Sequence, residues 1–173
     1  MMENVTLQDL KSIARSARGY IDHIYLHWTA GRYHQTFADY HINITGDGGI
    51  VISTTDLTEK KAHTWRRNGR AVGVTLCCAY NASPNAMGDY PPTEAQIEVM
   101  SQVVSILAAE MNLSISADVV MTHAEAADLD SYGPATTCER WDLWHLPDSA
   151  DGQIKPGGEV IRGKASWHLQ AGG

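Results

Sequence analysis

The sequence predicts a single α/β domain. Its 173 residues are enough for one domain with its own hydrophobic core. Segments with the two-residue period of strands alternate with segments that have helical periodicity. The composition, 43% hydrophobic and 19% charged residues, is typical of a folded globular chain. A formal net charge of −7 excludes nucleic acid as the expected partner, because domains that bind it carry a basic surface.

The N-terminal part is expected to hold a helix, a strand and a hairpin. Apolar residues recur at helical spacing over residues 6–18, and Gly19 ends that pattern. The segment "YIDHIYLH" alternates between two faces, which is typical of a strand, and it ends on His27. Further on, "YHINITGDGGIVIST" has alternating isoleucines on both sides of a glycine-rich turn, which favours a tight hairpin.

The second half adds two strands and one long helix. The segment "AVGVTLCC" is expected to be a central strand with two small buried cysteines, and "NASPNAMGDYPP" a loop. A capping box at Thr93 and Gln96 begins a helix whose apolar stripe extends to Met111. A short strand, "ADVVMTH", then ends on His123. Beyond it we expect irregular chain, apart from a short helix near "ERWDLWHL" and a loose tail over 163–173.

Composition also sets expectations about the cellular context. The three cysteines include an adjacent pair and are odd in number, so no disulfide framework is expected. No stretch approaches the roughly 20 apolar residues of a membrane span, so we expect no integral membrane association. The amphipathic start "MMENVTLQDLKSIARSARG" has no signal-peptide core, which predicts synthesis in the cytoplasm.

Two predicted strands each end on a histidine, and this pattern indicates a metal site. If the strands are neighbours in the sheet, the imidazoles of His27 and His123 come together. Catalytic zinc takes three protein ligands and leaves one position open for water. The polar stretch after His123 offers several candidates for the third ligand: Asp128, Asp130, Cys138, Glu139 and Asp142. There is no HExxH motif, which excludes the zinc site carried by a single helix.

Five segments in order carry a resemblance to a known family: "IYLHWTAG", "YHINITGDGGI", "AHTWRRNGRAVGVTLC", "PTEAQIEVM" and "THAEA". Together they resemble the zinc-dependent N-acetylmuramoyl-L-alanine amidases of the phage lysozyme and peptidoglycan-recognition family, over residues 20 to about 145. The resemblance implies a central mixed β-sheet flanked by helices, with Zn²⁺ in a groove on one face. We therefore expect an amidase domain with its core at about 20–147 and a partly irregular extension at 148–173.

The resemblance also implies roles for individual residues. The two histidines of the family's zinc site match His27 and His123. The family's third ligand is Asp or Cys, often with a basic residue two positions earlier that stabilises the oxyanion. Arg140 precedes Asp142 at that spacing, so Asp142 is the expected third ligand and Arg140 the expected oxyanion group. Cys138 is the alternative third ligand.

Phage members of the family carry a tyrosine before a histidine on the second strand, and "DYHINI" supplies Tyr40 as the matching catalytic residue. Other members place a glutamate on the strand that corresponds to "VGVTLC", which has no carboxylate here. His63 and Asn68 are expected to line the substrate groove. The arginines of "WRRNGR" fit either contact with an acidic peptide stem or a solvated loop.

These observations predict a zinc-dependent, monomeric peptidoglycan hydrolase that cleaves the amide between N-acetylmuramic acid and L-alanine. One alternative is a module that binds peptidoglycan without cutting it. Another is a zinc peptidase that cuts within the stem peptide of a muropeptide. The expected biological role is a phage or prophage lysin that reaches the bacterial cell wall after phage-mediated release, with cytoplasmic recycling of wall fragments as the other possibility.

Overall fold

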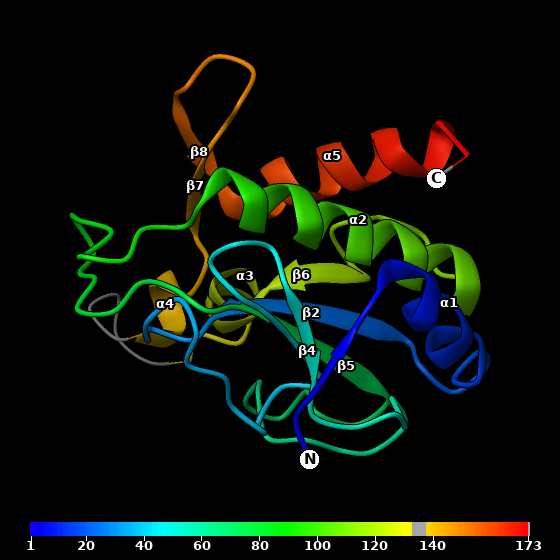
Figure 1. The fold of residues 1–173 in the computed structure, drawn as a ribbon. Coiled ribbons are helices and arrows are strands. Elements are labelled where there is room, and N and C mark those ends of the chain that lie inside the picture. The colour runs from blue at the N-terminus through cyan, green and yellow to red at the C-terminus, as the bar shows by residue number, and fades with distance from the viewer. Residues whose placement is uncertain (133–137, 173) are drawn as a thin grey trace.

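A mixed β-sheet forms the centre of the molecule (Figure 1). The structure is a computed structural model that describes residues 1–132 and 138–172. Within these residues the sheet has six strands in the order β1-β4-β3-β5-β2-β6. The strands are β1 (Glu3–Val5), β2 (His23–Trp28), β3 (Ile42–Ile44), β4 (Ile50–Ile52), β5 (Ala71–Leu76) and β6 (Val120–Thr122). Strands β3, β5, β2 and β6 run parallel, whereas β4 is antiparallel to both β3 and β1. The predicted α/β fold with a mixed sheet is confirmed.

Strand β2 lies between β5 and β6, so both of its edges are paired. His27 is opposite Thr75 of β5, and Leu26 is opposite Thr122 of β6. Because all three strands are parallel, their carboxyl ends meet at one edge of the sheet, where ligand sites form in α/β proteins. This arrangement brings the end of β2 next to the end of β6.

The β3–β4 hairpin has the predicted glycine-rich turn. Gly48 adopts a φ of 88°, in the left-handed region that glycine enters without steric cost. Its N–H donates to the carbonyl oxygen of Thr45 at 2.8 Å, which closes the turn. The hairpin predicted from alternating isoleucines is therefore present, with strands shorter than the sequence pattern.

Three helices cover one face of the sheet: α1 (Leu7–Arg15), α2 (Glu94–Met111) and α5 (Gly157–Gln170) (Figure 1). The predicted capping box of α2 is present, with Gln96 N–H 3.0 Å from Thr93 Oγ1. The Gln96 amide also donates to the carbonyl oxygens of Ile44 and Cys77, at 3.1 and 2.9 Å. One side chain thus caps the helix and ties it to the sheet.

The C-terminal part is more ordered than the sequence predicts. After α3 (His123–Leu129) come α4 (Cys138–Trp141), which is the expected short helix, and a hairpin of β7 (His145–Pro147) and β8 (Ile154–Pro156). The prediction of a loose tail over 163–173 is wrong for residues up to Gln170, because α5 extends to that residue. Glycines lower its helix propensity, but Val160, Ile161 and Ala165 are buried, and packing against α2 overrides weak local preference.

No helix among residues 1–132 and 138–172 has the length and apolar content needed to cross a bilayer. Cys77 and Cys78 follow β5 and are fully buried, as expected for small core residues.

Candidate metal centre

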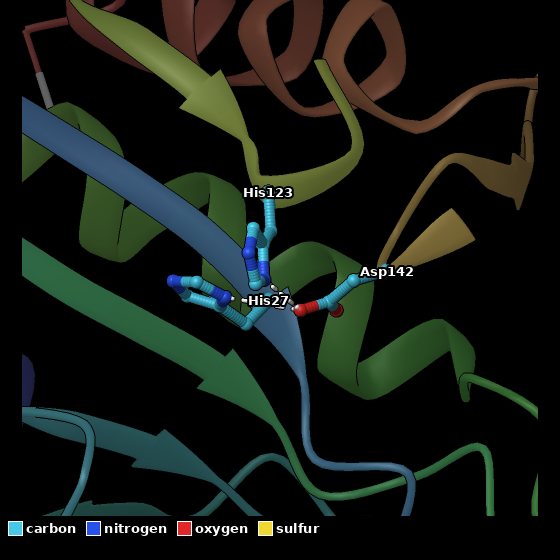
Figure 2. Close-up of side chains that lie close together, drawn as sticks. All are labelled: His27, His123 and Asp142. Carbon is cyan, nitrogen blue, oxygen red and sulfur yellow. Dashed lines mark hydrogen bonds and ion pairs between the residues drawn. The ribbon is translucent and has the colours of Figure 1, made fainter. Parts of the chain in front are cut away.

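His27, His123 and Asp142 meet at the carboxyl edge of the sheet (Figure 2). His27 lies near the end of β2, His123 is the first residue of α3 directly after β6, and Asp142 directly follows α4. One potential ligand atom from each residue lies within 4.8 Å of the other two. We refer to these three residues as the metal centre.

The carboxylate of Asp142 connects the two imidazoles. Its Oδ2 lies 3.1 Å from Nδ1 of His27 and 2.9 Å from Nδ1 of His123. Its Oδ1 accepts the backbone N–H of Trp28 at 2.6 Å, and its carbonyl oxygen accepts the N–H of Ala124 at 3.2 Å. Side chain and backbone are both held, so the position of Asp142 is fixed relative to both histidines.

Burial and hydrogen bonding set the protonation of the metal centre. His27 is fully buried, and this burial lowers its pKa, although the hydrogen bond with Asp142 opposes the shift. Burial by itself would raise the pKa of Asp142, but hydrogen bonds with His123 and His27 outweigh it and lower the pKa. A neutral imidazole and an ionised carboxylate are the forms that bind a metal.

The residues present fit a zinc ion. Two imidazoles and one carboxylate form a donor set of catalytic zinc sites, which keep a further position open. Two ligand atoms that face away from the centre have partners too: Nε2 of His27 lies 3.2 Å from Thr64 Oγ1, and Oδ1 of Asp142 accepts from the Trp28 N–H. Such outer hydrogen bonds orient metal ligands in proteins.

Tyr40 lies against the metal centre. Its ring centroid is 5.0 Å from that of His27, at an interplanar angle of 54°. Burial, followed by the negative charge of Asp142, raises the pKa of the Tyr40 phenol, and a hydrogen bond with Thr75 opposes the shift. The phenol is therefore a neutral hydrogen-bond donor beside the histidines.

Two further predictions concern Arg140 and Cys138, which lie close to Asp142 in the sequence. Arg140 lies on α4 and donates to the carbonyl oxygen of Tyr132 at 2.9 Å and to Asp128 at 3.0 Å. That Arg140 stabilises the oxyanion stays a prediction. Cys138 begins α4, and its side chain lies outside the described part of the chain, so the alternative ligand also stays a prediction.

His63 and Asn68 belong to a loop that contacts His27 through Thr64 and His63. The His63 side chain is buried, and its ring meets that of His27 edge-on with 5.3 Å between centroids. The Asn68 side chain accepts the backbone N–H groups of His63 and Thr64, at 3.1 and 2.8 Å. Asn68 thus shapes the loop that presents His63. Contact of either residue with substrate stays a prediction.

Two arginines of the same region are part of structural ion pairs. Arg67 binds both carboxylate oxygens of Asp130 at 2.7 Å. Arg70 binds Asp22 on the other side, with its Nε 2.7 Å from the carboxylate. These bidentate pairs connect the loop to neighbouring segments. Whether the arginines of this loop also contact an acidic peptide stem stays a prediction.

Sequence reasoning missed two features of the site. Helix α3 was not predicted, although Thr122 and Glu125 form a capping box that can be read from their spacing. Helix α3 begins after this cap at His123, whose side chain contacts Asp142. The contact of Thr64 with His27 has no signal in the sequence, because the two residues are 37 positions apart.

Comparison with known proteins agrees with this geometry. A family model described as N-acetylmuramoyl-L-alanine amidase matches residues 17–157. Comparison with curated proteins gives no match. The matched region includes the whole metal centre, Tyr40 and the loop that carries His63. Since the match covers most of its length, the chain belongs to the N-acetylmuramoyl-L-alanine amidase family.

Proposed function

We propose that the chain is a zinc-dependent hydrolase that cleaves the amide between N-acetylmuramic acid and L-alanine in peptidoglycan. Family membership supports the substrate and the bond. The observation that carries the proposal is the convergence of His27, His123 and Asp142 at the carboxyl edge of the sheet. Three protein ligands that leave a position open are what zinc hydrolysis requires.

His27, His123 and Asp142 would hold the zinc ion. Bound zinc would supply a Lewis acid for the amide carbonyl and lower the pKa of water to about 7. The protein keeps the ligands in the required forms, because burial disfavours protonation of His27 and hydrogen bonds keep Asp142 ionised. The Trp28 N–H holds one oxygen of Asp142 and leaves the other directed at the histidines.

Tyr40 would stabilise the negative charge that develops on the amide oxygen. Its phenol stays protonated because burial and the nearby Asp142 raise its pKa. A neutral donor fixed beside the metal centre can strengthen its hydrogen bond as charge builds up in the transition state. Arg140 is proposed as a second group for the same charge, since it lies two residues before Asp142 and its guanidinium is held at α3 by Asp128.

The two alternative functions make different demands on the site. A module that only binds peptidoglycan needs no third ligand, so the contacts of Asp142 with both histidines favour hydrolysis. A peptidase that cuts within the stem peptide would use the same metal centre. The masses of the released fragments distinguish the two reactions.

Digestion of purified peptidoglycan tests the proposal. Amidase action should release intact stem peptides that begin with L-alanine, together with glycan that carries free lactyl groups, as measured by mass spectrometry. A chelator should abolish the release and added zinc should restore it, while a His123→Ala variant should stay inactive in zinc. Full activity in chelator, or fragments cut within the stem, would contradict the proposal.

We also propose that the enzyme acts as a phage or prophage lysin on the bacterial cell wall. Peptidoglycan is the substrate implied by the family. Added to cells whose outer membrane has been permeabilised, the protein should cause lysis. Activity confined to soluble wall fragments would instead support a recycling enzyme.

A further inference from the structure

The hydroxyl of Thr64 lies between two buried imidazoles. Its Oγ1 is 3.2 Å from Nε2 of His27 and 2.8 Å from Nδ1 of His63. The exposed fractions of His27, Thr64 and His63 are 0%, 3% and 7%, so none of these groups can exchange its partner for bulk water. A hydroxyl has one proton to donate, which limits how the two rings can be protonated.

The metal centre selects one arrangement of these protons. Nδ1 of His27 faces Asp142 and is the atom that would bind a metal, so with a metal bound it would carry no proton. The neutral ring then carries its proton on Nε2 and donates it to Thr64 Oγ1. The Thr64 hydroxyl is left to donate to Nδ1 of His63, and His63 is protonated on Nε2.

The structure fixes His63 in the position to accept this proton. Gly73 of β5 leaves space for the His63 ring, since a Cβ at residue 73 would lie 2.7 Å from its Cγ and Cδ2. His41 closes another side, with its ring edge-on to His63 at 5.6 Å. His41 itself is held, because its Nδ1 accepts the Gly73 N–H at 3.0 Å and its Nε2 donates to the backbone carbonyl oxygen of Glu59 at 2.6 Å.

The Thr64 hydroxyl is the hydrogen-bond partner of the His63 ring within the part of the chain that the structure describes. Nε2 of His63 is buried and makes no hydrogen bond of good geometry within the described residues. A proton on this nitrogen therefore follows from the hydrogen bond that Nδ1 accepts from Thr64, not from a partner of its own.

We propose that Thr64 is a positioning residue for the metal centre: by accepting from Nε2 of His27 and donating to Nδ1 of His63, it holds His27 in the tautomer with Nδ1 free for the metal. This inference rests on the metal centre of the proposed function. Without the hydroxyl, the Nε2–H of His27 would be buried without an acceptor. The other tautomer, whose Nδ1–H donates to Asp142, would then be favoured and would compete with the metal.

Zinc affinity of two Thr64 variants tests this role. Thr64→Val keeps the shape of the side chain and removes the hydroxyl, whereas the control Thr64→Ser keeps the hydroxyl. Competition with a chromophoric chelator should show zinc binding weakened by about 10-fold to 100-fold in Thr64→Val, the range for outer partners of metal ligands. Thr64→Ser should bind within about threefold of the wild type. Wild-type affinity in Thr64→Val would overturn the proposal.

Nitrogen-15 NMR of the zinc-loaded wild type gives a second measurement that needs no variant. We expect His27 and His63 both to carry their proton on Nε2. A proton on Nδ1 of His63, or zinc bound through Nε2 of His27, would overturn the inference. The proposed function fails separately: zinc-loaded wild type that releases no stem peptides refutes the amidase, while wild-type zinc affinity in an active Thr64→Val refutes only the role of Thr64.

Discussion

The two faces of strand β2 are equally buried but differ in chemistry. On one face, Ile24 and Leu26 are 0% exposed and pack in the main core beneath α2. On the other, Tyr25 and His27 are 2% and 0% exposed and lie among polar groups. Burial therefore does not distinguish the functional face from the structural face of this strand.

The difference lies in how each face is stabilised. The apolar face depends on close packing, which tolerates swaps that conserve volume. On the polar face each donor needs a specific acceptor, because an unpaired buried polar group costs about 1–3 kcal/mol. Asp142 contacts Nδ1 of His27, Nδ1 of His123 and the Trp28 N–H. Substitutions of the metal-binding groups on the polar face should therefore alter metal binding, and large-to-small substitutions on the apolar face should mainly alter stability.

The largest effect is expected for the third ligand. Asp142→Asn keeps an oxygen for the Trp28 N–H but removes the charge, so the fold should survive while bound zinc and amidase activity are lost. Zinc content per chain and release of stem peptides measure both. The matched control is Cys138→Ser, which should keep zinc and activity. A zinc-free Cys138→Ser beside a fully loaded Asp142→Asn would assign the third ligand to Cys138.

On the apolar face, Leu26→Ala should lower the free energy of unfolding by about 2–5 kcal/mol, because it leaves a cavity in a close-packed core. Urea denaturation measures the change. The control variant on the other face is Tyr25→Phe, which removes a hydroxyl bonded to Arg67. It should lower the free energy of unfolding by about 1 kcal/mol. Folded Leu26→Ala should still bind zinc. Loss of zinc without loss of stability would contradict the separation of the two faces.

Tyr40→Phe should affect only the reaction. The ring and its packing on His27 remain, so zinc content and stability should stay near those of the wild type. If the phenol stabilises the oxyanion, kcat should fall by about 10-fold to 1000-fold, with little change in KM. An unchanged kcat would restrict Tyr40 to a packing role.

The pH dependence of the metal-free protein should also arise on the polar face. Burial lowers the pKa of His27, His41 and His63 in the folded protein. Below the ordinary histidine pKa of about 6.5, the unfolded chain therefore binds more protons than the folded protein. When the pH is lowered from about 7 to 5, the free energy of unfolding should decrease by up to about 1.4 kcal/mol per pH unit for each histidine. Asp142, with its lowered pKa, loses its stabilisation only at lower pH. Denaturation curves that coincide across this range would contradict the prediction.

Local sequence signals predicted helices α1 and α2, the β3–β4 hairpin and strands β2, β5 and β6. The capping box at Thr93 and Gln96, the turn at Gly48 and the histidines near strand ends can each be recognised from neighbouring residues, because the backbone preferences involved are local. The juxtaposition of His27 and His123 required only one further step, that β2 and β6 be parallel neighbours.

Other features were decided by tertiary structure. Helix α5 has glycines that weaken its local signal, and its buried residues pack against α2, far away in the sequence. Asp142 was chosen as third ligand only through the family resemblance, while the structure joins it to His27 across 115 positions. The bridge from Thr64 to His27 and His63 had no sequence signal at all. Periodicity and turn residues act over a few positions, whereas a buried hydrogen bond depends on which side chains the folded chain brings within about 3 Å of each other.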